Sequence, residues 1–115
     1  MKKNIIKDKS FTFAIDIVYL YKKLVSTDKE FIMSKQLLKS GTSIGANIRE
    51  AEFAQSKLDF INKISISLKE ANETDYWLDL LHATNYINEN DFAQYKKKSN
   101  EMLKLLVSIV KSAKH

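Results

Sequence analysis

The sequence predicts an all-α protein, an antiparallel up-down-up-down four-helix bundle in which residues 1–115 form one domain. The chain has 115 residues and 44% hydrophobic content, enough for a single core. It has no proline and only two glycines, so it lacks the turn residues that a β protein requires. Apolar residues recur every three or four positions in four segments separated by short polar breaks. Such short connections favour antiparallel neighbours.

The first predicted helix covers about residues 10–25 and the second about residues 27–54. Thr27 and Glu30 have the spacing of a capping box, which predicts the start of the second helix after a break at residues 26–28. The expected core residues of the first helix are Phe11, Ala14, Ile17, Val18, Tyr21, Leu24 and Val25. Those of the second are Leu37, Leu38, Gly41, Ile44, Gly45 and Ile48.

Gly41 and Gly45 are the two glycines of the chain, and both lie inside the second predicted helix. A glycine in a helix interior costs roughly 0.5–1 kcal/mol relative to alanine. Spaced four apart, the two lie on one face, where a missing Cβ lets another backbone come close. The pair therefore predicts a close contact between the second helix and a neighbour.

The third predicted helix runs from Ser56 to about Thr84, and the fourth extends to about Ala113. Ser56 followed by Asp59 is a helix start signal, and Asn88 is the expected N-cap of the fourth helix after the polar run 85–90. Inward-facing residues of the third helix are Phe60, Ile61, Ile64, Leu68, Ala71, Leu78 and Leu81. The heptad-like seam of the fourth is Phe92, Tyr95, Met102, Leu106, Ile109 and Ala113.

A polar stripe lies beside the apolar face of the second predicted helix. Its members, at four-three-four-three spacing, are Gln36, Ser40, Ser43, Asn47 and Glu50. One interpretation is an ordinary polar flank. The other is a hydrogen-bonded seam against a neighbouring helix, in which small serines permit close approach and Asn47 and Glu50 fix the register. The adjacent glycines favour the seam.

The third predicted helix has a second apolar face. Ile66, Trp77 and Leu80 fall within about 60° of each other and roughly opposite Ile64, Ala71 and Leu78. A single bundle cannot bury both sides of one helix, so these three residues predict a subunit interface of a homo-oligomer. The alternative is that Trp77 folds over the surface of its own subunit.

The net charge of +5 is unevenly distributed along the chain. Residues 1–40 carry a balance of +5, residues 41–89 a balance of −4, and residues 90–115 a balance of +4. An antiparallel bundle brings the end of the first helix to the start of the fourth. Lysines that would form a nucleic-acid-binding surface there are Lys22, Lys23, Lys96, Lys97 and Lys98. Alternatively, the lysine content reflects only an AT-rich genome.

Catalytic chemistry has little support in the sequence. There is no cysteine, which removes disulfides and thiol nucleophiles. Asp79 and His82 have the carboxylate-x-x-His spacing that di-iron bundles use twice, but the other histidine is the terminal His115. We therefore expect no enzyme activity, no metal and no cofactor. The absence of a signal-like or membrane-spanning apolar run predicts a cytoplasmic protein without membrane association.

The run Ser34-x-Gln-Leu-Leu-Lys-Ser-Gly-x-Ser-Ile-x-Ala-Asn-Ile-x-Glu-Ala51 resembles the signature of small four-helix bundle proteins encoded in 23S rRNA intervening sequences. Phe60 and residues 64–74 resemble that family's second block, and the likeness covers nearly the whole chain. Arg49-Glu50-Ala51 departs from the Glu-Gly pair of many members. The resemblance implies a homopentamer. It extends to the accessory protein of diversity-generating retroelements, which binds nucleic acid through a basic surface and engages a reverse transcriptase.

Three functional hypotheses follow. The leading one is a non-enzymatic homo-oligomeric scaffold that binds structured RNA or DNA through its basic surface. The alternative is a protein–protein adaptor with no nucleic-acid ligand, in which the polar stripe or an apolar face docks another polypeptide. A hydrolase or metal enzyme that uses the acidic residues of the second and third helices is the weakest of the three.

Overall fold

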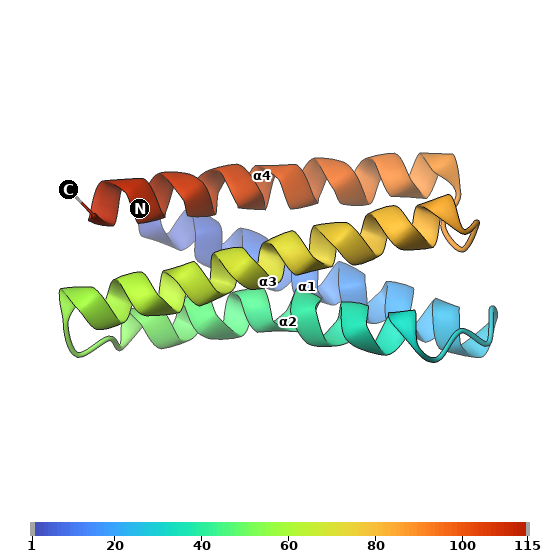
Figure 1. Ribbon diagram of the computed structural model, residues 1–115, viewed down its shortest axis with the longest axis horizontal. Coiled ribbons are helices and arrows are strands. Elements are labelled where there is room, and N and C mark those ends of the chain that lie inside the picture. The colour runs from blue at the N-terminus through green and yellow to red at the C-terminus, as the bar shows by residue number, and fades with distance from the viewer. Residues whose placement is uncertain (1, 115) are drawn as a thin grey trace.

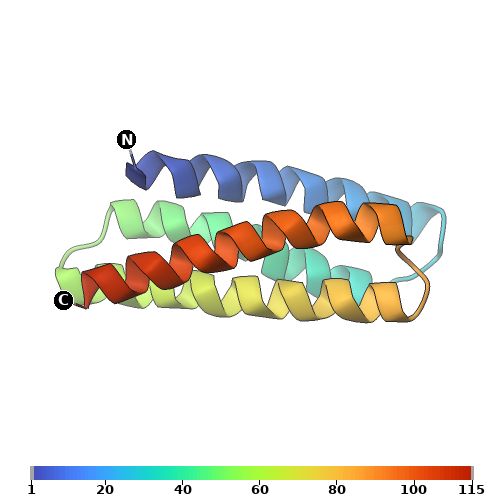
Figure 2. The same ribbon diagram turned by 90° about the horizontal axis from the view of Figure 1, so that it is seen from above.

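The computed structural model describes the backbone of residues 2–114 and the side chains of residues 5–114. This part of the chain forms four helices: α1 (Lys2–Ser26), α2 (Met33–Glu52), α3 (Lys57–Ala83) and α4 (Glu89–Ala113). Consecutive helices run in opposite directions, and the two ends of the chain lie at the same end of the bundle (Figures 1 and 2). The predicted all-α four-helix bundle is confirmed.

The helices stand in a ring in which each packs against two neighbours. α2 contacts α1 and α3, and α4 closes the ring by contacting α3 and α1. Within residues 2–114, no close backbone approach joins α1 to α3, so these two helices lie on a diagonal. Figure 2 shows the same arrangement, with α4 crossing between α1 and α3 on the near side.

The core is a continuous column of aliphatic side chains from all four helices. Its completely buried members include Ile17, Leu24, Leu37, Ile44, Leu78, Leu81 and Leu106. Burying one such side chain stabilises the fold by roughly 1.5–3 kcal/mol. Each helix contributes at three- and four-residue spacing, the period that the sequence predicted.

α1 differs from its prediction in both its start and its inward face. It begins at Lys2 rather than near Ser10, and Phe11, predicted in the core, is exposed. The residues of α1 that are buried are Ile6, Ser10, Phe13, Ile17, Leu20 and Leu24. Because α1 has apolar residues on two sides, the period alone could not tell which side faces inward. The lysines around Ile6 also interrupt the apolar pattern, so the first turns of the helix were not predicted.

The prediction that α2 starts at a Thr27–Glu30 capping box is wrong. α2 starts at Met33, and the Glu30 carboxylate accepts hydrogen bonds from the backbone N–H groups of Met33 (3.0 Å) and Ser34 (2.7 Å). Lys29, with φ 55°, reverses the chain before this cap. Glu30 therefore acts as the capping residue itself, because its longer side chain reaches over the turn to the first N–H groups of α2.

The two glycines lie on the side of α2 that faces α1. A Cβ added to Gly41 would come within 2.8 Å of Ile17 Cγ2, and one added to Gly45 within 3.3 Å of Ser10 Oγ. The predicted close helix–helix contact is confirmed, and its partner is α1.

Both predicted caps of the later helices are confirmed. Ser56 Oγ accepts a hydrogen bond from the backbone N–H of Asp59 at 3.0 Å, and Asn88 Oδ1 accepts one from Asp91 at 2.8 Å. α3 ends at Ala83, with Thr84 as its C-cap, one residue from the predicted end. None of the helices in residues 2–114 combines the length and the apolar character needed to cross a membrane.

Candidate nucleic-acid and subunit interfaces

Lys96, a predicted phosphate contact, is half-buried and forms ion pairs with two aspartates of α3. Its Nζ lies 2.7 Å from Asp75 Oδ1 and 3.0 Å from Asp79 Oδ1, and Ser99 donates a further hydrogen bond to Asp75. Burial alone would lower the pKa of Lys96, but the hydrogen bonds and charges of the two aspartates raise it above its ordinary value. The ammonium is therefore neutralised locally and ties α4 to α3.

Two more of the predicted lysines are also paired with carboxylates. Lys98 donates to Asp16, which joins α4 to α1, and Lys23 lies 3.6 Å from Asp28 in the loop after α1. Lys22 and Lys97 have no carboxylate partner among the described residues, and the Lys22 ammonium lies 5.6 Å from the centre of the Tyr19 ring. Of the five predicted lysines, these two keep a charge available for a ligand.

The outward side of α4 carries a row of lysines that the sequence prediction missed in part. Lys97, Lys104 and Lys111 are exposed and spaced seven apart, so they follow one line at intervals of about 10.5 Å. Lys104 lies two residues, or about 200°, from the buried Met102, which places this line opposite the core. None of the three is paired with a carboxylate in the described part of the chain. We call these residues the α4 lysine row.

The seven-residue spacing of the α4 lysine row was visible in the sequence. The prediction instead favoured consecutive lysines 96–98, which cannot all point the same way because successive helical residues are rotated by 100°. Lys96 faces α3, Lys98 faces α1, and Lys97 faces outward between them.

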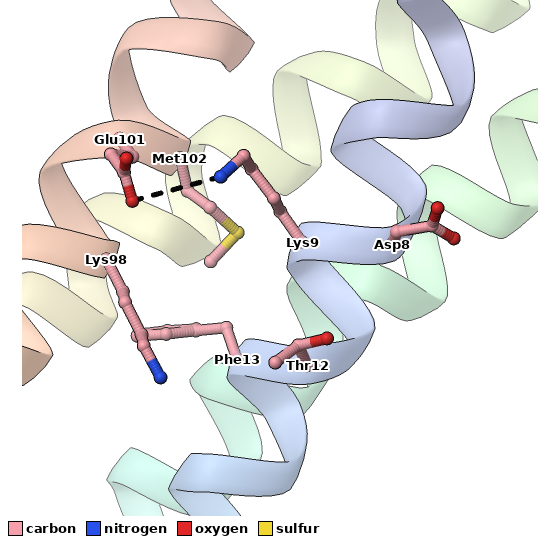
Figure 3. A pocket seen from close by; sticks show the side chains of 7 residues that line it. All are labelled: Asp8, Lys9, Thr12, Phe13, Lys98, Glu101 and Met102. Carbon is pink, nitrogen blue, oxygen red and sulfur yellow. Dashed lines mark ion pairs between the residues drawn. The ribbon is translucent and has the colours of Figure 1, made fainter. Parts of the chain in front are cut away.

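A pocket of about 280 Å³ lies between α1 and α4 (Figure 3). Two lysines, Lys9 and Lys98, and two acids, Asp8 and Glu101, line it together with three uncharged residues. Lys9 Nζ lies 4.0 Å from Glu101 Oε1, the ion pair drawn in Figure 3. Because the positive and negative groups balance, this pocket offers no net attraction for an anion, in contrast to the α4 lysine row.

The polar stripe of α2 divides into one buried member and four more exposed ones. Ser40 is buried, and its Oγ accepts a hydrogen bond from Thr74 Oγ1 of α3 at 2.9 Å. Ser43 and Asn47 bond to carbonyls of their own helix. Gln36 and Glu50 are exposed.

The hydrogen bonds that join α2 to α3 use two residues that the sequence analysis did not select. These are Thr74 and Ser67, and the Ser67 hydroxyl donates to the carbonyl of Ile44. Both are buried in line with Ala71 and Leu78, and their seven-residue spacing on an apolar face was the available signal.

The predicted subunit-interface residues lie along the outer side of α3. Ile66 is exposed, while Trp77 and Leu80 are half-buried. The indole N–H of Trp77 points to Glu73 Oε1 at 3.5 Å, and the Tyr76 ring stands edge-on to it with centroids 5.1 Å apart. Trp77 thus packs against its own core and remains partly exposed.

Asp79 and His82 take different partners. Asp79 pairs with Lys96, whereas His82 Nε2 lies 2.7 Å from Glu89 Oε1 and its ring stacks on Phe92 at 3.8 Å. In the described residues, no three His, Cys, Asp or Glu side chains are grouped so that they could hold a metal ion.

The sequence and the fold match a known family. A family described as 23S rRNA-intervening sequence protein matches residues 2–108. The chain belongs to this family. It is 62% identical to a protein of unknown function from the S23 ribosomal protein family of Bacteroides thetaiotaomicron, whose crystal structure superposes with a TM-score of 0.94. That match covers 96% of this chain and 99% of the other. A comparison with curated proteins found no match.

Proposed function

We propose that this member of the 23S rRNA-intervening sequence family is a non-enzymatic, homo-oligomeric scaffold in the cytoplasm. It binds structured RNA or DNA and requires neither a metal nor a cofactor. The observation that supports this proposal most directly is the α4 lysine row: three exposed ammonium groups in one line with no carboxylate partner among the described residues. Lys22 adds a fourth unpaired charge on the neighbouring helix α1.

The chemistry of the α4 lysine row favours phosphate contacts over base recognition. A lysine ammonium contacts a phosphate as a point charge and carries no sequence information. The aromatic side chains of α4, Phe92 and Tyr95, are half-buried against the core and so are poorly placed to stack on unpaired bases. A rigid, straight row suits the regular backbone of a double-stranded segment. Lys23, Lys96 and Lys98 serve the fold through their ion pairs.

The test compares two triple variants with the same change in charge. Lys97→Gln/Lys104→Gln/Lys111→Gln removes the row, and Lys35→Gln/Lys39→Gln/Lys57→Gln removes three exposed lysines from α2 and α3. Affinity is measured by fluorescence anisotropy with an RNA hairpin and a matched DNA duplex over a range of salt concentrations. The first variant should lose at least tenfold in affinity. For this variant the slope of log K against log salt should be less negative by about two to three, because each phosphate contact contributes about 0.9 to the slope. The control variant should remain close to wild type.

Two results would count against this assignment. Equal losses of affinity in both triple variants would mean that net charge alone attracts the nucleic acid. Binding by wild type that disappears well below physiological salt would favour the protein–protein adaptor. The feature that supports this second function is the exposed apolar side chains of the α1–α2 loop, Phe31 and Ile32, and of the α2–α3 loop, Phe53. An affinity-purified partner that is lost from a variant with all three changed to Ser would support it.

Self-association is the second part of the proposal, and the family resemblance makes five the expected number of subunits. Ile66, Trp77 and Leu80 would lie in the subunit interface. The support is that Ile66 is exposed and Trp77 only partly buried in a single bundle.

A further inference from the structure

A cavity of about 410 Å³ opens between the four helices at the end of the bundle where the chain begins and ends (Figures 1 and 2). We call it the end cavity. Its volume is in the range of small-molecule binding sites. All four helices contribute to its wall, and six of the seven lining residues are apolar: Ile6, Ile48, Ala51, Phe60, Ile64 and Ile109.

The interior of the bundle is less completely filled at the end cavity than in the middle. In the middle of the bundle, Ile17, Ile44 and Leu78 are completely buried. At the end cavity, Phe60 and Ile109 are only half-buried. Protein interiors normally leave few voids larger than a water molecule. An apolar molecule in the end cavity would therefore supply packing contacts that its wall lacks.

The polar group of the cavity wall is Glu52, which pairs with a lysine at the mouth. Glu52 Oε1 lies 3.1 Å from Lys7 Nζ, and the two side chains are 37% and 41% exposed. A lysine ammonium has three N–H donors. Lys7 can therefore donate to a second carboxylate at the mouth while it stays paired with Glu52.

The end of the bundle around the cavity is positively charged. Residues 1–9 carry four lysines and one aspartate, and residues 109–115 carry two lysines and no acidic side chain. Residues 57–63, at the start of α3, carry two lysines and one aspartate. The last turn of α2, with Arg49, Glu50 and Glu52, offsets only part of this charge. The field at the mouth therefore favours an anionic head group over a cationic one.

We propose that the end cavity binds a free fatty acid of medium chain length. The aliphatic chain lies among the apolar side chains of the wall, and the carboxylate accepts a hydrogen bond from Lys7. The site is separate from the α4 lysine row, because Lys111 lies two residues, or about 200°, from the cavity-lining Ile109. This inference therefore does not depend on the nucleic-acid binding proposed above.

Calorimetric titration with three probes of equal chain length tests the ligand class. Decanoate, decanol and decylamine are compared below their critical micelle concentrations. Decanoate should bind about fivefold more tightly than decanol, the usual effect of one charged hydrogen bond, and decylamine should bind most weakly. From hexanoate to octanoate, affinity should rise about fourfold per added methylene.

Three outcomes of this titration would overturn the proposal. Equal affinity for decanoate and decanol would exclude the carboxylate contact. No binding of decanoate would exclude the site itself. Retention on phosphatidylglycerol vesicles without binding of free decanoate would mean that this end of the bundle contacts a membrane surface instead.

Variants that fill the end cavity test where the chain lies. Ala51→Leu and Ile109→Trp place larger side chains in the wall, and Ala93→Leu makes the same change as the first at an exposed position of α4. Each filling variant should lose at least about tenfold in affinity for both decanoate and decanol, because the room for the chain is gone. Ala93→Leu should bind as wild type does. Circular dichroism identifies the variants that fold, and unchanged affinity in a folded filling variant would overturn the assignment.

Variants at the mouth test the head-group contact. Lys7→Gln should weaken decanoate binding about fivefold and leave decanol binding unchanged. Lys9→Gln is the control, because Lys9 is 45% exposed and pairs with Glu101 beside a different pocket. Glu52→Gln removes the competing carboxylate and should strengthen decanoate binding. Equal losses in Lys7→Gln and Lys9→Gln would mean that net charge alone attracts the anion, which would overturn the contact with Lys7.

Discussion

At the scale of single residues, the start of α2 depends on one buried carboxylate. Glu30 accepts hydrogen bonds from the backbone N–H groups of Ile32, Met33 and Ser34. Burial tends to raise the pKa of Glu30, but the three N–H donors, together with the Ser34 side chain, hold it below its ordinary value. Because the folded pKa is lowered, the stability that Glu30 contributes is fully present above its unfolded pKa. It is lost as pH falls through the folded pKa.

Glu30→Gln should lower the free energy of unfolding by about 1 kcal/mol near neutral pH, the usual contribution of a helix cap. Urea unfolding followed by circular dichroism, from pH 7 down to pH 3, measures the effect. The difference in the free energy of unfolding between wild type and variant should become smaller as the carboxylate becomes protonated. A gap that stays constant with pH would mean that the charge of Glu30 is not what stabilises the turn.

Replacing each of the two glycines with alanine should change the stability of the fold by different amounts. At Gly41 the new Cβ would meet Ile17 at 2.8 Å, and a branched buried side chain close to its own backbone cannot move aside easily. We expect Gly41→Ala to lower the free energy of unfolding by about 1–3 kcal/mol. At Gly45 the nearest atom to a new Cβ is Ser10 Oγ, at 3.3 Å, and the other neighbours lie at ordinary contact distance. The gain in helix propensity of up to about 1 kcal/mol should therefore offset most of the crowding in Gly45→Ala. Thermal unfolding of both variants tests this order, and equal melting temperatures would contradict it.

At the scale of helices, side chains from different elements set how each pair packs. α1 and α2 meet at Gly41, α2 and α3 share the buried Ser40–Thr74 hydrogen bond, and α3 and α4 share the Lys96 cluster. The polar contacts fix the axial register of helices that aliphatic packing alone would leave free to slide, as polar pairs do in coiled coils.

Replacing Lys96 tests the α3–α4 cluster. Lys96→Met should cost about 1–3 kcal/mol of unfolding free energy, since Asp75 would remain partly buried without its cation. Lys97→Met, one position along and exposed, should change stability by less than about 0.5 kcal/mol. Denaturant titrations of the two variants give the comparison. Similar losses for both would show that the cluster contributes no more than an ordinary surface charge.

At the scale of the whole molecule, the proposed ligand and subunit surfaces lie on different helices. The α4 lysine row lies on α4, whereas Ile66, Trp77 and Leu80 lie on α3, which packs beside α4 in the ring. An assembly built through the outer side of α3 would leave α4 accessible in every copy and repeat the row within the particle. Repetition multiplies weak phosphate contacts through effective concentration.

Assembly should therefore not depend on nucleic-acid binding, whereas tight binding of a long duplex should depend on assembly. The Lys97→Gln/Lys104→Gln/Lys111→Gln protein should keep the wild-type mass in sedimentation velocity while losing affinity for a long RNA duplex. Ile66→Asp should lose mass and, with it, at least tenfold in affinity for the same long duplex, while a hairpin too short to reach two copies is bound as before. A long-duplex affinity that is independent of mass would contradict the multivalent arrangement.

Local signals in the sequence were sufficient for the fold and for several of its details. The three-to-four apolar period predicted four helices, Ser56 and Asn88 predicted two starts, and Gly41 with Gly45 predicted a close contact. Each of these depends on residues a few positions apart, whose relation the helix geometry already determines. The role of Glu30 was predicted wrongly, as the partner of Thr27 in a capping box, because its real role depends on the loop conformation at Lys29.

The sequence by itself determined that this protein is a four-helix bundle of the 23S rRNA-intervening sequence family, with more apolar surface on its third helix than one bundle can bury. Only the tertiary structure decided which side of α1 faces inward and which lysines stay unpaired. Lys96 and Lys97 are neighbours in the chain, yet one lies between two aspartates of α3 and the other faces outward. The physical reason is that a side chain's charge environment depends on the helix packed beside it, and α3 is far from Lys96 in sequence.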